Sequence, residues 1–185
     1  MEIAVVYESV YGNTHEVADA IAEGVHEAEP EATVACLRVG DAVPDRVRSA
    51  DLLIVGGPTH MHGMSSGMSR KMAVQGEAKK AAEGTETVHE IEPGAESPGL
   101  RDWFHQLPDT TKGHFAAAFD TRAEFKLAGG AAGGIAHRLH RHGYDMVGEE
   151  GFLIDQAEGP LRDGERDRAR AWGAALVHQL ATAGR

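Results

Sequence analysis

The chain has 185 residues and a mass of 19.7 kDa, which predicts one domain spanning residues 1–185. Its 29 acidic and 18 basic residues leave a formal net charge of -11, which disfavours nucleic acids and anionic membranes as partners. A single cysteine excludes an internal disulfide framework and a multi-cysteine zinc site. No apolar run is long enough to span a bilayer, and no basic segment precedes the first apolar run. These features predict a soluble cytoplasmic protein without membrane insertion.

The first elements in the chain are a strand, a polar turn and a helix. Residues 3–7 form a continuous apolar run, which is typical of a strand buried on both faces of a parallel sheet. A helix with an apolar stripe follows the turn. Asn13 or Thr14 is its predicted N-cap, and Glu16 stands where a capping-box acid would reach back to Asn13.

The same alternation continues to the end of the chain. Four more strands are predicted at residues 33–39, 51–57, 114–119 and 145–154. Helices are predicted at residues 45–50, from residue 67 onward, and at 99–107, 135–142 and 163–181. Residues 84–98 are acidic and poor in large apolar side chains, so we expect an exposed loop there. Five strands alternating with helices predict an α/β fold, an open parallel sheet covered on both faces.

The turn after the first strand, residues 8–14 (ESVYGNT), has the composition of an anion site. It offers two hydroxyls, an amide, a glycine and the free N–H groups of a starting helix, whose dipole favours negative charge. The turn has no lysine or arginine and lacks the Walker pattern, so a phosphate would be held by neutral donors. An ordinary capped turn is the alternative interpretation.

Three segments together resemble a known family. The pattern Tyr7-x-Ser9-x-x-Gly12-Asn13-Thr14 resembles the phosphate loop of flavodoxins and flavodoxin-like flavoproteins. Residues 55–60 (VGGPTH) resemble the family's second flavin loop, and residues 119–122 (FDTR) stand where the third would be. The resemblance implies a flavodoxin-like three-layer sandwich, with a five-stranded parallel sheet in the order 2-1-3-4-5 and noncovalently bound flavin mononucleotide (FMN).

The resemblance also implies which residues bind the cofactor. The phosphate would be held by Ser9, Val10, Gly12, Asn13 and Thr14, with Tyr11 contributing its backbone. One side of the flavin ring would be lined by Pro58, Thr59, His60 and Met61, and the other by Asp120, Thr121 and Arg122. Gly56 and Gly57 are expected to let the flat ring approach the strand. His60, His62 and Arg122 are expected to place positive charge near the ring.

The second loop departs from the family because it lacks the large aromatic side chain that usually covers the flavin. The one ring near the third loop is Phe125. An under-covered flavin leaves room for a second substrate. The prediction is therefore an FMN-binding electron-transfer protein, either a redox carrier or a reductase, whose partner is a redox protein or a small-molecule donor or acceptor. Two alternatives stay open: an NAD(P)H-dependent quinone-type oxidoreductase that uses FMN, and a cofactor-free interaction module.

Other patterns in the chain are interpreted structurally. Residues 63–67 match G-x-S-x-G, but the preceding strand is predicted to end at Gly57, so Ser65 would lie on a loop and hydrolysis is disfavoured. The histidines at 60 and 62 lack a third ligand nearby, and those at 137, 140 and 142 alternate with arginines, so we predict no metal site. Residues 129–134 are interpreted as a flexible turn before a helix.

Overall fold

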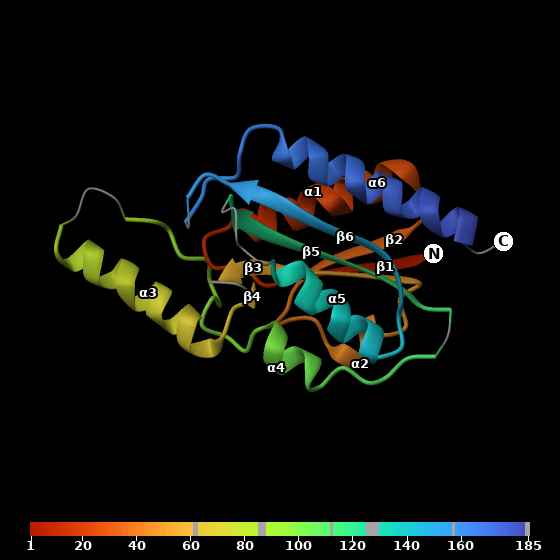
Figure 1. Ribbon diagram of the computed structural model, residues 1–185, viewed down its shortest axis with the longest axis horizontal. Coiled ribbons are helices and arrows are strands. Elements are labelled where there is room, and N and C mark those ends of the chain that lie inside the picture. Colours follow the sequence, from red (N-terminus) through yellow and green to blue (C-terminus); the bar gives the residue numbers. More distant parts are fainter. Residues whose placement is uncertain (61–62, 85–87, 112, 125–129, 157, 184–185) are drawn as a thin grey trace.

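Five parallel strands form the sheet at the centre of the molecule (Figure 1). The computed structural model describes residues 1–60, 63–84, 88–111, 113–124, 130–156 and 158–183. The strands are β1 (Glu2–Tyr7), β2 (Thr33–Arg38), β3 (Leu52–His60), β5 (Phe115–Ala123) and β6 (Asp145–Ile154). Their order across the sheet is β2-β1-β3-β5-β6. Counting only these parallel strands along the chain, the predicted order 2-1-3-4-5 is confirmed.

Helices cover both faces of this sheet, which confirms the predicted three-layer sandwich. One face carries α1 (Asn13–Ala28) and α6 (Glu165–Ala183). The other carries α2 (Pro44–Val47), α4 (Leu100–Phe104) and α5 (Ala131–Arg141). Figure 1 shows the first pair above the sheet and the second group below it. Among the described helices, none is long and apolar enough to cross a bilayer.

The central strand β3 is apolar from Leu52 to Val55 because it supplies both layers of the core. Successive side chains of a strand point to opposite faces. In β3, Leu52 and Ile54 pack with α1 and α6, whereas Leu53 and Val55 pack with α4 and α5. All four of these side chains are fully buried.

Two strands continue past their predicted ends. β3 runs through Pro58 to His60, where it pairs with the short antiparallel strand β4 (Gly63–Met64). Pro58 lacks only its own N–H, and it still lies opposite Thr121 in the ladder with β5. The expectation that a loop begins at Pro58 is therefore wrong. β5 likewise extends to Ala123, so the expected third flavin loop is still strand at residues 120–122.

The predicted capping of α1 is also wrong. The N-cap is Gly12, whose φ of 90° is a left-handed conformation that glycine adopts at little cost, and no side chain caps the helix. The Asn13 amide instead donates to the carbonyl oxygen of Glu158 at 2.9 Å. The Thr14 hydroxyl is bonded to the Thr121 hydroxyl at 2.7 Å. Both side chains are used by contacts distant in sequence.

Helix α5 begins earlier than predicted and contains Gly133 and Gly134, which were expected to form a turn. Its first turn is capped by groups from neighbouring strands. The Ala131 N–H donates to the Thr59 hydroxyl at 2.8 Å, and the Ala132 N–H donates to the Asp120 carboxylate at 2.9 Å. These acceptors stabilise a helix start that the local sequence does not predict. Residue 129 lies outside the described residues.

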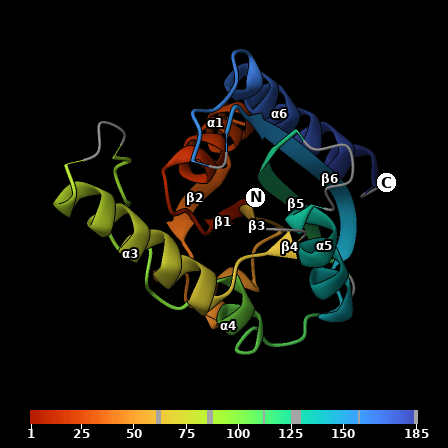
Figure 2. The same ribbon diagram turned by 60° about the vertical axis from the view of Figure 1, so that its left-hand side comes forward.

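Helix α3 (Gly67–Ala82) stands apart from both helical layers in the two views of Figures 1 and 2. Its buried side chains are polar, Arg70 and Glu77. Arg70 reaches the carboxylate of Glu8 at 3.5 Å, and the Glu77 carboxylate accepts the N–H of His89 at 2.7 Å. Met72 is 65% exposed. Polar contacts therefore hold α3 in place.

The acidic segment 84–98 is partly anchored. In its described residues it has no helix or strand, but Ala95 is buried. The Glu92 N–H donates to the carbonyl oxygen of Val10 at 2.9 Å, and the Glu92 carboxylate pairs with Arg38 at 3.0 Å. The prediction of a simply exposed loop is therefore corrected, because the segment packs against the turn after β1.

Candidate functional site

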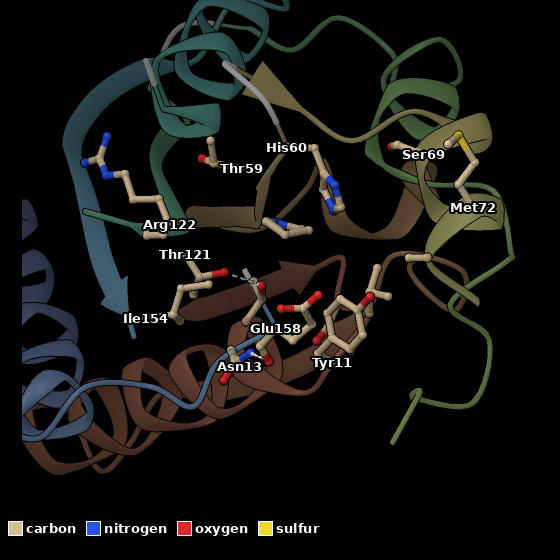
Figure 3. Close-up of a pocket in the computed structure, with 16 residues that line it drawn as sticks. Tyr11, Asn13, Thr59, His60, Ser69, Met72, Thr121, Arg122, Ile154 and Glu158 are labelled. Carbon is tan, nitrogen blue, oxygen red and sulfur yellow. Dashed lines mark hydrogen bonds between the residues drawn. The ribbon is translucent and has the colours of Figure 1, made fainter. Parts of the chain in front are cut away.

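A cleft of about 430 Å³ lies at the carboxyl ends of the strands, lined by 16 residues (Figure 3). Ligands of open parallel sheets bind at this edge. The structure brings together here most of the residues that the sequence predicted for the cofactor, namely Ser9, Val10, Tyr11, Asn13, Thr14, Pro58, Thr59, His60, Thr121 and Arg122.

Three predicted cofactor residues are not brought into this lining. Met61 lies outside the described residues. Gly12 is the N-cap of α1 and does not line the cleft. Asp120 is fully buried, and its carboxylate accepts the Ala132 N–H and lies 3.3 Å from Nε of Arg122. Asp120 therefore positions α5 and Arg122 from behind the cleft wall.

The turn after β1 presents an uncharged set of hydrogen-bond donors. Because α1 begins at Asn13, the N–H groups of its first turn have no intrahelical acceptor. The buried Ser9 hydroxyl accepts the Gly12 N–H at 3.1 Å and keeps its own hydrogen to donate. Thr14, also buried, stands beside Ser9 in the lining. Donors at a helix N-terminus suit an anion.

Two rings line the cleft. Figure 3 shows His60 and Tyr11 on opposite sides of its opening, from β3 and from the turn after β1. The sequence predicted only a backbone role for Tyr11, whereas its side chain lies in the cleft, with the ring of His89 packed edge-on at 6.1 Å. Burial raises the pKa of Tyr11, so the phenol keeps its proton at neutral pH.

The expected positive charge around the cleft is not supplied by His60 or Arg122. Burial lowers the pKa of His60 below its ordinary 6.5, and Arg70 lowers it further while Glu8 opposes the change. His60 is therefore neutral near pH 7. Figure 3 shows the Arg122 guanidinium directed away from the centre of the cleft. Its Nε lies 3.3 Å from the carboxylate of Asp120, with which it forms an ion pair. His62 lies outside the described residues.

Gly56 and Gly57 are required by internal packing. A Cβ on Gly56 would lie 2.1 Å from the ring of Phe119, and one on Gly57 would lie 2.8 Å from the side chain of Leu100. Neither glycine lines the cleft. The expectation that these glycines admit a flat ligand is wrong, because the space that a side chain would fill is already occupied.

The sequence missed the lining residues outside the three loops: Ser69, Met72 and Ala73 on α3, Ala123 at the end of β5, and Ile154 and Glu158 after β6. The α3 residues follow the i, i+3, i+4 spacing that places side chains on one helical face. Ile154 ends a strand at the edge where ligands bind. Topology could therefore have identified Ile154, whereas the spacing shows only that the three α3 residues share a helical face.

Two other patterns have structural roles. Ser65 of the G-x-S-x-G match is buried, donates its hydroxyl to Glu8 and accepts from Arg70 at 3.0 Å, so it is not an exposed nucleophile. His142 pairs with Asp109 at 3.0 Å. In the described part of the chain, no group of three or more His, Cys, Asp or Glu side chains is arranged to hold a metal ion.

Comparison with known proteins identifies the family. The flavodoxin family model matches residues 5–172. Flavodoxin 2 from Bacillus cereus has a similar fold, with 17% identity over 97% of this chain and 99% of that chain and a TM-score of 0.64. A flavodoxin from the domain Archaea gives 18% identity over 98% and 99% of the chains and a TM-score of 0.62.

A diflavin flavoprotein from Nostoc sp. shares the fold at 16% identity, over 98% of this chain and 94% of that chain, with a TM-score of 0.52. No curated protein matches the chain. The family model covers nearly the whole sequence, from within β1 to within α6, and includes the turn after β1 that lines the cleft. The chain therefore belongs to the flavodoxin family.

Proposed function

We propose that the cleft binds FMN noncovalently and that the protein transfers electrons through it. The observation that carries this proposal is that the start of α1 and the ends of β3 and β5 line one continuous cleft. Neutral donors at the start of α1 suit a dianionic phosphate, and they open directly onto the β3 and β5 edges. A phosphate attached to a flat ring system matches that arrangement, and family membership supports it.

The residues of this chain have distinct roles in the proposal. The hydroxyls of Ser9 and Thr14 and the first N–H groups of α1 hold the phosphate. Thr59, His60 and the side chain of Tyr11 border the ring. FMN supplies the one-electron or two-electron chemistry when it is bound. The protein orients it and excludes water from its phosphate end.

A second candidate is a reductase that takes electrons from NAD(P)H and passes them to a quinone-type acceptor. The feature that favours it is the α3 side of the cleft. The α3 residues there, Ser69, Met72 and Ala73, are small or flexible, and Met72 is largely exposed. A wall of this kind leaves room for a second planar molecule against the flavin.

We propose that the redox partner is either a protein or a small-molecule donor or acceptor. The net charge of -11 favours a basic surface on a protein partner. We also propose a cytoplasmic location.

The first experiment is addition of FMN to the purified chain, followed by gel filtration and a visible spectrum. The proposal predicts that a flavin band elutes with the protein at one FMN per chain. Elution of all the flavin as free molecule would contradict the proposal and favour a cofactor-free interaction module.

Reduction of the loaded protein then distinguishes the two candidates. Rapid bleaching by NADH or NADPH identifies the reductase. Bleaching only by dithionite, in two separate one-electron steps, identifies the carrier.

A further inference from the structure

A second hollow lies between α4 and α5, on the lower face of the sheet in Figure 1. Its volume is about 530 Å³, within the range of small-molecule sites, and it shares no lining residue with the FMN cleft. The lining is cationic and aromatic: Arg101, Phe104, His105, Asp109, His137, Arg138, Arg141 and His142. This concentration of basic groups is unusual in a chain with a net charge of -11.

The three guanidinium groups in this hollow lack carboxylate partners. Among the described residues, none of the three arginines forms an ion pair. Arg101 donates to the backbone oxygens of Ser65 and Met64, each at 2.8 Å. Arg138 donates to the Gly134 oxygen at 3.1 Å. Asp109, the one carboxylate in the lining, is 3.0 Å from His142 and is used by that contact.

These cations also repel one another. The pKa of Arg138 is lowered by burial and then by the nearby charges of Arg101 and Arg141. The dipole at the C-terminal end of α5 accounts for cations on that helix. It does not account for Arg101, which reaches the same hollow from α4. An arrangement that brings three guanidinium groups together, none of them in a described ion pair with a carboxylate, is suited to an anionic ligand.

The hollow has a rigid floor. Phe104 is buried, and its ring is stacked with that of His142 at 6.2 Å and an angle of 14°. The loop after α4 is fixed to the end of α5, since the Thr110 N–H donates to the His142 oxygen at 2.8 Å. The cationic groups are therefore presented by two elements whose relative position is set before any ligand arrives.

We propose that this hollow binds a small molecule carrying a diphosphate group. Guanidinium groups match phosphate oxygens through paired, charge-assisted hydrogen bonds. Three of them around one hollow suit two adjacent phosphates better than a single one. The diphosphate belongs either to a free anion or to a nucleotide, and the two sources are distinguished by titrating with inorganic pyrophosphate and with ADP.

The test is calorimetric titration of the purified full chain with each probe. The proposal predicts saturable binding that weakens as salt is raised. Arg138→Gln and Arg141→Gln should each weaken pyrophosphate binding by at least about tenfold. Arg46→Gln is the matched control, because Arg46 is exposed, lies outside the hollow and forms no ion pair among the described residues. It should leave the affinity unchanged.

Tighter binding of ADP than of pyrophosphate would assign the site to a nucleotide, and the reverse to the free anion. Thr14 lines the FMN cleft and not this hollow, so Thr14→Ala should leave pyrophosphate binding unchanged. The titration therefore tests this hollow whether or not the other cleft binds FMN. The proposal is overturned if neither probe saturates at millimolar concentration, if Arg46→Gln weakens binding as much as Arg138→Gln, or if Thr14→Ala alone abolishes it.

Discussion

Thr14 illustrates how single residues connect distant parts of the cleft. Its buried hydroxyl lies 2.7 Å from that of Thr121, so the start of α1 is tied to the end of β5. The same hydroxyl lines the cleft beside Ser9. One atom therefore serves both the position of the helix and the proposed phosphate site.

Replacement of Thr14 by alanine should weaken FMN binding by about 1–3 kcal/mol, because a buried hydrogen bond to a charged group is lost. The dissociation constant from quenching of FMN fluorescence measures the effect. The matched control is Thr111→Ala, which removes a threonine hydroxyl at an exposed position outside the cleft and should leave the affinity for FMN unchanged. Equal affinities of the two variants would show that Thr14 does not hold the phosphate.

His60 should make folding stability depend on pH. Its pKa in the folded protein is lowered by burial, so between that value and about 6.5 the unfolded chain binds more protons than the folded chain. The free energy of unfolding should therefore fall as the pH drops below about 6.5. Urea unfolding of the wild type and of His60→Gln at about pH 7.5 and about pH 5.5 measures it. The wild type should lose more stability than the variant, and identical losses would show that protonation of His60 does not cause the change.

The residues of the cleft were predictable where they directly follow a strand. Ser9 and Thr59 lie just past the predicted ends of two strands, so topology, loop composition and the family resemblance placed them at the ligand edge. Met72 was not predictable, because it comes from a helix whose position depends on tertiary contacts. The neutral state of His60 was also hidden, since it depends on burial that only the packed structure reveals.

At the scale of elements, α3 differs from the other long helices. Helices α1, α5 and α6 are fixed by apolar side chains in the two core clusters, whereas neither cluster contains a residue of α3. Its first turns are fixed by Arg70, which is 2% exposed and reaches both Glu8 and Ser65. Glu8 directly precedes Ser9 of the proposed phosphate site. The ion pair thus connects α3 to the cleft.

Removal of this cation should be costly, because Glu8 is 4% exposed and its carboxylate would stay buried without its ionic partner. We expect Arg70→Met to lower the free energy of unfolding by about 3–5 kcal/mol. Chemical denaturation measures the change. Lys71→Met, next to it on the exposed side of α3, should stay within about 0.5 kcal/mol. A loss below about 1 kcal/mol for Arg70→Met would contradict the proposed role of the pair.

The order of the elements was predictable from alternating apolar runs and helical patterns, but their ends were not. β3 and β5 run on because neighbouring strands continue to pair with them. α5 starts early because Thr59 and Asp120 cap it from other elements. α3 has its large apolar residues, Met68 and Met72, exposed, so no pattern in its sequence indicates where it packs. Contacts between distant segments set all of these features.

At the scale of the whole molecule, charge is distributed unevenly. The chain carries -11 overall, yet the proposed FMN cleft has neutral donors at the start of α1, and the hollow between α4 and α5 is cationic. An acidic protein can hold a phosphate in this way because the helix N-terminus supplies local positive potential. Net charge therefore limits large polyanionic partners without excluding a small anionic ligand.

In the proposed function, the start of α1 recognises the phosphate of FMN. Fluorescence titration with FMN and with riboflavin, which has the same ring and no phosphate, tests it most directly. FMN should bind at least about a hundredfold more tightly, since each hydrogen bond to the charged phosphate contributes about 1.5–3 kcal/mol. Equal affinity for the two flavins, or quenching of neither, would contradict the claim.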